Sequence, residues 1–191
     1  RLDILKRWYE RSPDGFSFSV KAPRQITHFK KFRDARQKLS DFNGMAKEGL
    51  GGKLGSVLFQ FPSDFHFAAD RLSRMTEMLD PSVPNVVEFR HRSWWNDEVY
   101  AALSDSKIAF CGMSHPALPN DVISTTERLY YRFHGVPHVY NSAYDGQTLE
   151  QVAMAMLRRG GRQALVYFNN TPDGHAVTNA RQLQDICELV H

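Results

Sequence analysis

VVEFRH, at residues 86–91, begins as an apolar strand and then adds two charged side chains. Side chains two apart in a strand point to the same face of a sheet, so Glu88 and Arg90 are predicted to lie side by side. A carboxylate and a guanidinium in an otherwise apolar strand need partners or a cavity. The stretch therefore predicts a buried strand whose end carries either a ligand site or a structural ion pair.

Five further runs share this apolar composition, rich in β-branched and aromatic residues. With the run at 85–89, the predicted strands are 16–20, 56–61, 107–113, 129–134 and 164–169. Helical patterns follow at 67–79, 97–103, 149–157 and 177–189, the last with apolar spacing that reaches Val190, and an amphipathic helix pattern opens the chain. Alternating strands and helices predict a parallel sheet in a single domain over residues 1–191.

Composition limits the partners and the compartment. The 191 residues are 42% hydrophobic, and 24 Lys and Arg against 21 Asp and Glu leave a net charge of only +3, which permits an anionic partner. Cys111 and Cys187 lie far apart in apolar or helical contexts, which is typical of reduced thiols rather than a disulfide framework. Because no apolar run is long enough to span a bilayer and no signal-like segment opens the chain, we expect a cytoplasmic protein without a membrane partner.

Polar side chains gather at the C-terminal ends of the predicted strands. They are Lys21, Gln60, Glu88, Arg90, Arg132 and His134. In parallel α/β folds the ligand lies at these strand ends, so the location of these side chains predicts a ligand site. We expect Glu88, Arg90, Arg132 and His134 to form one connected group.

Five segments, FSFSVKAPRQITH, VLFQFP, VEFRHRSWW, YYRFHG and VYFNNTPDGHAVTNA, resemble the signature segments of the DUF72 family, also called YecE-like proteins. The resemblance covers almost the whole chain, in order. It implies a TIM-type β/α barrel of unestablished function, in which this chain supplies the third to the eighth strand and the first two strands precede Arg1. It also marks the loop residues His28, Tyr144 and His175.

The cations around one carboxylate favour a small ligand that carries a phosphate or carboxylate group. The candidate catalytic residues are Glu88 as general base, or as the partner that orients an arginine, and His134 as proton carrier. The candidate ligand-binding residues are Lys21, Gln60, Arg90, Arg132, Tyr144, Asn169, Asn170 and His175. These residues also have structural alternatives. Glu88 and Arg90 could form a structural ion pair, and Asn169 and Asn170 could satisfy backbone groups in a turn. The TPDG sequence at 171–174, which follows them, should turn the chain into the last helix.

The reaction and the cofactor stay open. The sequence has no nucleophile elbow, dinucleotide loop or phosphate loop, so no cofactor is evident, and a hydrolase, lyase or isomerase all fit. The visible strand ends lack a metal-binding cluster, but strands before Arg1 could add metal ligands. A nucleic-acid-binding or nucleic-acid-processing barrel is an alternative, suggested by the basic stretch at 27–33 and a sequence pI near 8.9. A non-catalytic binding protein is another, and nothing indicates the oligomeric state.

Overall fold

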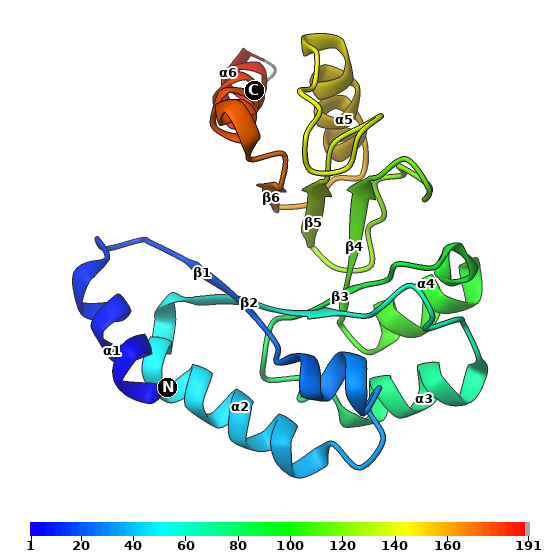
Figure 1. Ribbon diagram of the computed structural model, residues 1–191. Coiled ribbons are helices and arrows are strands. Elements are labelled where there is room, and N and C mark those ends of the chain that lie inside the picture. The colour runs from blue at the N-terminus through cyan, green and yellow to red at the C-terminus, as the bar shows by residue number, and fades with distance from the viewer. Residues whose placement is uncertain (190–191) are drawn as a thin grey trace. The chain divides into compact units, whose positions relative to one another are not determined.

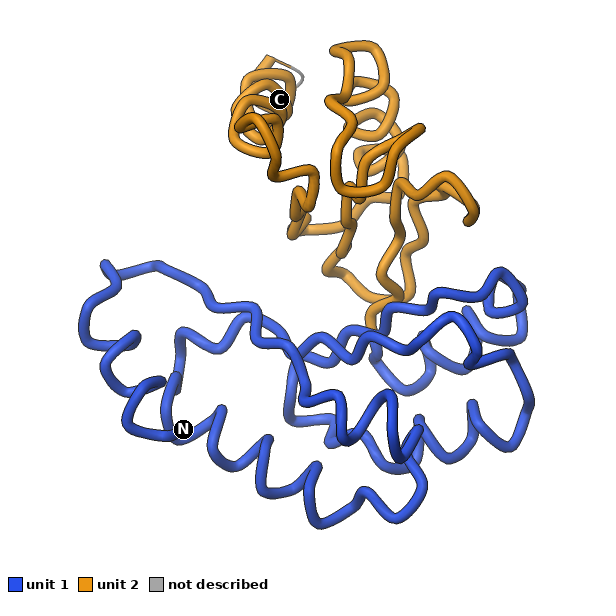
Figure 2. The backbone as a smooth tube through the Cα atoms, viewed as in Figure 1, with its two compact units in different colours: residues 1–108 blue, residues 109–191 orange. Residues whose placement is uncertain are grey.

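Strands and helices alternate along the chain, as Figure 1 shows. The computed structural model describes residues 1–189, so Val190, the last apolar residue of the final predicted helix, lies outside the described residues. The chain divides into unit 1, residues 1–108, and unit 2, residues 109–191 (Figure 2). That residues 1–191 form a single domain stays a prediction.

Unit 1 contains a parallel three-stranded sheet in the order β1, β2, β3. Its elements are α1 Leu2–Arg11, β1 Phe18–Lys21, the π-helix η1 Gln25–Phe29, α2 Arg36–Leu50, the 3-10 helix η2 Gly51–Lys53, β2 Leu54–Gln60, α3 Ala69–Met78, β3 Asn85–Glu88, the 3-10 helix η3 Arg92–Trp94 and α4 Asp97–Asp105. In Figure 1, α2 and α3 lie on the same side of this sheet. The opposite face of the sheet therefore does not pack on these two helices.

Unit 2 contains a second parallel sheet in the order β4, β5, β6. Its elements are β4 Ala109–Ser114, β5 Arg128–Phe133, α5 Gly146–Arg158, β6 Gln163–Phe168, the 3-10 helix η4 Pro172–Gly174 and α6 His175–Leu189. A cluster of buried side chains joins alternate residues of β5 to α5 and α6, with Phe133 stacked on Phe168 at 4.6 Å between ring centroids. Arg132 and His134 alternate with Phe133, so they lie on the other face of β5.

Aromatic rings form the core on one face of the unit 1 sheet. Phe61 stacks on Phe89 at 5.4 Å, Phe89 stacks on Trp94 at 4.0 Å, and the Trp94 Nε1–H donates to the carbonyl oxygen of Phe65 at 2.6 Å. Because side chains alternate along a strand, Gln60 and Glu88 lie on the face opposite Phe61 and Phe89. One face of the sheet is thus packed with rings, and the other is left for polar groups.

All six predicted strands exist, and every neighbouring pair within a unit is parallel, as the alternating pattern predicts. The four helices expected between and after the strands are also confirmed, with ends that differ by no more than three residues. The closed TIM-type barrel is not confirmed and stays a prediction, and the two earlier strands expected before Arg1 are not borne out. What is shown is an α/β fold with three parallel strands in each unit. None of the helices within residues 1–189 has the length and apolar character needed to cross a bilayer.

Candidate functional site

Four polar side chains lie in a row at the C-terminal ends of β1, β2 and β3. Lys21 Nζ donates to Gln60 Oε1 at 2.7 Å, and Gln60 is paired in register with Glu88 on the next strand. Arg90 Nε donates to Glu88 Oε1 at 2.6 Å. These residues, Lys21, Gln60, Glu88 and Arg90, are called the polar row below. The adjacency of Glu88 and Arg90, predicted from their spacing, is confirmed.

The polar row runs from the protein interior to the solvent. The Glu88 side chain is 0% exposed and the Arg90 side chain 12%, whereas Gln60 is half-buried and Lys21 is exposed. Two cations face one carboxylate, so the row carries a net charge of +1. The row has a buried ion pair at one end and an exposed ammonium at the other, an arrangement suited to hold an anion.

Beyond Lys21 the chain enters the π-helix η1, which carries His28. The His28 ring is half-buried, and its Nδ1 lies 2.9 Å from Thr27 Oγ1. Burial lowers the pKa of His28, and the positive charges of Arg24 and Lys21 lower it further, while Asp64 opposes them. These effects favour the neutral form of the imidazole. The same charges make the surface that follows β1 electropositive.

The strand ends of unit 2 hold a second polar group. Arg132 Nη2 donates to Asn169 Oδ1 at 2.7 Å, because Asn169 follows β6 two residues after Tyr167, which is paired with Arg132. His134 is fully buried, and its backbone N–H donates to the carbonyl oxygen of Ser114 at 3.0 Å. Arg132, His134 and Asn169 thus share the face opposite the unit 2 core. Whether this group connects with Glu88 and Arg90 stays a prediction.

Tyr144 and Asn170 belong to a buried hydrogen-bond network. Tyr144 Oη accepts from the Gly135 N–H at 2.7 Å and donates to Ser114 Oγ at 3.0 Å, and burial raises the pKa of this phenol. Asn179 Oδ1 accepts from the Tyr144 N–H and from Asn170 Nδ2, each at 3.0 Å. The network ties the loop after β5 to α6. Sequence reasoning missed Asn179.

The TPDG turn leads into the last helix as predicted. η4 ends at Gly174 and α6 begins at His175, with left-handed backbone at Asp173, φ 55°, and at Gly174, φ 75°. His175 is the first residue of α6 and is half-buried. The Asn170 side chain keeps its Oδ1 buried and without a hydrogen-bond partner among the described residues.

Metal-ligating side chains are not grouped in the described part of the chain. Within residues 1–189, no three or more His, Cys, Asp or Glu side chains lie close enough together to hold a metal ion. The polar row is instead composed of an amide, a carboxylate, an ammonium and a guanidinium. The ammonium, the guanidinium and the amide N–H groups can donate hydrogen bonds to an oxyanion, and the carboxylate can accept one from a hydroxyl group.

Parallel strands followed by helices, with polar side chains at the C-terminal ends of the strands, define an α/β protein, a class in which ligands commonly lie at strand ends. The family model described as "Protein of unknown function DUF72" matches residues 2–191. The chain belongs to that family.

Relatives of known sequence or structure agree with this assignment. The chain is 26% identical to the UPF0759 protein YunF of Bacillus subtilis (strain 168), over 96% of this chain and 77% of YunF. It is similar to the crystal structure of a DUF72 family protein, TM1631, from Thermotoga maritima, with a TM-score of 0.86, 26% identity and coverage of 98% of this chain and 79% of TM1631. A DUF72 family protein from Enterococcus faecalis, EF0366, shares the fold, with a TM-score of 0.84 at 18% identity over 100% of this chain and 81% of that protein.

Proposed function

We propose that the polar row binds a small ligand that carries a phosphate or carboxylate group. The observation that carries the proposal is the chain of contacts from the exposed Lys21 ammonium through Gln60 to the buried Glu88–Arg90 pair. A net positive charge remains after Glu88 has neutralised one of the two cations. Lys21 and Arg90 donate to the anion in this proposal, and Gln60 donates through its amide.

Glu88 is the general base of the proposal, or the partner that orients Arg90. In unit 2 we assign Arg132 and Asn169 to ligand binding and His134 to proton exchange, supported by their shared strand face. Tyr144, Asn170 and His175 complete the proposed binding residues. The reaction class, as hydrolase, lyase or isomerase, and the TIM-type barrel itself stay predictions, as does a cytoplasmic location.

Anion titration tests this proposal. Inorganic phosphate and citrate are titrated by calorimetry into the unsubstituted protein, Lys21→Gln and Arg90→Gln. Each substitution removes a charge-assisted hydrogen bond, so the binding free energy should fall by roughly 1.5 to 3 kcal/mol. Arg74→Gln is the control, because Arg74 pairs with Asp70 on the surface of α3. Anion affinity that is the same in all four proteins would refute the proposal.

Nucleic acid is the second candidate ligand, favoured by one observation on η1. The Phe29 ring is 74% exposed, with the Arg24 guanidinium carbon 5.8 Å from its centroid. Exposed rings stack on bases, and the basic residues of 27–33 can contact phosphates. For this function, Phe29→Ala should weaken the binding of an oligothymidylate, and binding should fall steeply with salt. Salt-independent binding, or none, would exclude it.

A further inference from the structure

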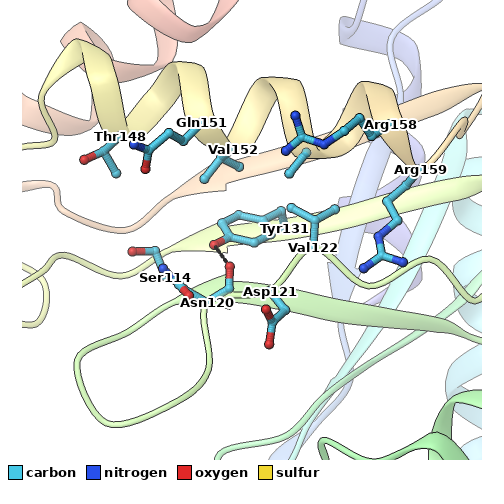
Figure 3. A pocket seen from close by; sticks show the side chains of 11 residues that line it. Ser114, Asn120, Asp121, Val122, Tyr131, Thr148, Gln151, Val152, Arg158 and Arg159 are labelled. Atoms are coloured by element: carbon cyan, nitrogen blue, oxygen red, sulfur yellow. Dashed lines mark hydrogen bonds between the residues drawn. The ribbon is translucent and has the colours of Figure 1, made fainter.

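A pocket of about 480 Å³ lies in unit 2 between α5 and the loop that follows β4 (Figure 3). Its volume is within the range of about 300 to 1,000 Å³ that is usual for small-molecule sites. Tyr131 forms part of its floor, and Tyr131 lies on the face of β5 opposite Arg132 and His134. The pocket therefore does not lie on the face of β5 that carries Arg132 and His134.

The loop wall of the pocket is held in place by two contacts. Tyr131 Oη donates to the carbonyl oxygen of Asn120 at 2.9 Å, the dashed line in Figure 3. Gly112 on β4 lets the loop pack directly on the sheet, because a Cβ there would lie 2.8 Å from the Asp121 carbonyl oxygen and 2.8 Å from the Tyr131 ring. The wall is thus preformed, so a ligand need not order it on binding.

The opposite wall is one face of α5, and its chemistry changes along the helix. Thr148 and Gln151 offer a hydroxyl and an amide at one end, and Arg158 and Arg159 offer guanidiniums at the other. At a rise of 1.5 Å per residue, the backbones of Gln151 and Arg158 are roughly 10 Å apart along the helix, a span that their long side chains shorten toward the length of a sugar phosphate. In Figure 3 the Arg158 side chain extends back along the helix and the Arg159 side chain extends toward Val122.

Charge decides which end takes an anion. Arg158 and Arg159 carry two positive charges, and Asp121 on the facing loop carries one negative charge, so the lining has a net charge of +1. Guanidinium groups bind phosphate through paired hydrogen bonds. The hydroxyl of Thr148 and the amide of Gln151 suit a ligand with hydroxyl groups.

We infer that this pocket binds a phosphorylated sugar, with its phosphate at Arg158 and Arg159 and its hydroxyl groups at Thr148 and Gln151. Arginines in the last turn of a helix also stabilise the helix dipole without any ligand. That role affects folding alone, so a binding measurement separates it from the inferred one.

The test is calorimetric titration of the full chain with D-glucose 6-phosphate, glucose and inorganic phosphate. The sugar phosphate should bind with a Kd of about 1 mM or tighter, and more tightly than either component. Arg158→Gln and Arg159→Gln should each weaken it about tenfold. Arg162→Gln is the matched control, since the Arg162 side chain is 82% exposed, pairs with Glu127 and does not line the pocket.

Several results would overturn the inference. They are the absence of D-glucose 6-phosphate binding, an equal loss in Arg162→Gln, and a loss in Arg158→Gln that is as large for inorganic phosphate as for the sugar phosphate. Should the arginine variants not fold, Gln151→Ala must weaken the sugar phosphate but not inorganic phosphate. A loss of sugar phosphate affinity in Arg90→Gln but not in Arg158→Gln and Arg159→Gln would place the ligand at the polar row and overturn this inference, so failure here is distinguishable from failure of the proposed function.

Discussion

Breaking the Glu88–Arg90 pair should destabilise the fold strongly, and Arg90→Gln measures that cost. Arg90 Nε lies 2.6 Å from Glu88 Oε1, with side-chain exposures of 12% and 0%. Removing one partner of a buried ion pair typically costs about 3 to 5 kcal/mol, because the remaining charge loses its partner away from water. Since the Glu88 carboxylate is wholly buried, we expect a loss of about 3 to 4 kcal/mol in the free energy of unfolding.

Glu88→Gln should cost less than Arg90→Gln. The new amide keeps an oxygen that can accept from Arg90 Nε, and the arginine left behind keeps some contact with water. The expected loss is that of a hydrogen bond to a charged group, roughly 1.5 to 3 kcal/mol. The order of the two variants therefore reports whether loss of the guanidinium or loss of the carboxylate charge costs more stability.

Urea denaturation followed by circular dichroism and tryptophan fluorescence gives these free energies by linear extrapolation. Arg74→Gln is the control, because the Asp70–Arg74 pair has side-chain exposures of 66% and 32% and should contribute no more than about 0.5 kcal/mol. If Arg90→Gln costs less than about 1 kcal/mol, like this control, the reasoning from burial is refuted. Replacing both residues by apolar ones, as Glu88→Leu with Arg90→Met, should restore most of the lost stability.

Three further substitutions test other parts of the structure. Lys47 and Ser82 hold the pKa of Asp80 at about 2, below its unfolded value near 4. Asp80→Asn should therefore lower the free energy of unfolding by about 1 kcal/mol at neutral pH after screening, and this loss should shrink as the pH falls from about 4 to about 2. Urea unfolding over that pH range checks it. Gly112→Ala should lower stability by about 1 to 3 kcal/mol in thermal or urea unfolding, since its Cβ would meet backbone, and unchanged stability would contradict the packing described. Tyr144→Phe removes a buried hydroxyl that accepts one hydrogen bond and donates another, and should cost about 1 to 3 kcal/mol by the same measurement, whereas a neutral effect would show that this network is not stabilising.

The strand ends were predictable because two short-range rules suffice for them. The period of two along a strand places Glu88 beside Arg90, and the parallel order of neighbouring strands brings Lys21 to Gln60 and Arg132 to Asn169. Neither rule needs knowledge of the loops. The same rules correctly give six strands, and parallel pairing within each unit.

Features that depend on distant contacts were not predictable. The helix α2 was missed because polar residues and Gly44 interrupt its apolar spacing, although its Leu39, Ala46 and Leu50 are buried. Asn179 lies in a helix pattern that gives no sign of its bonds to Tyr144 and Asn170, which come from other segments. The pocket under α5 depends likewise on where the loop after β4 packs.

Stability alone does not account for the polar row. Phe59 on β2, and Phe61 and Phe89 just after β2 and β3, are fully buried on one face of the sheet, so apolar packing was available to the same strands on the other face. A buried ion pair is often no more stabilising than apolar residues of similar size. A variant with Glu88→Leu and Arg90→Met that unfolds like the unsubstituted protein but no longer binds phosphate would assign the pair to ligand binding. Weaker folding with unchanged phosphate affinity would assign it to the fold.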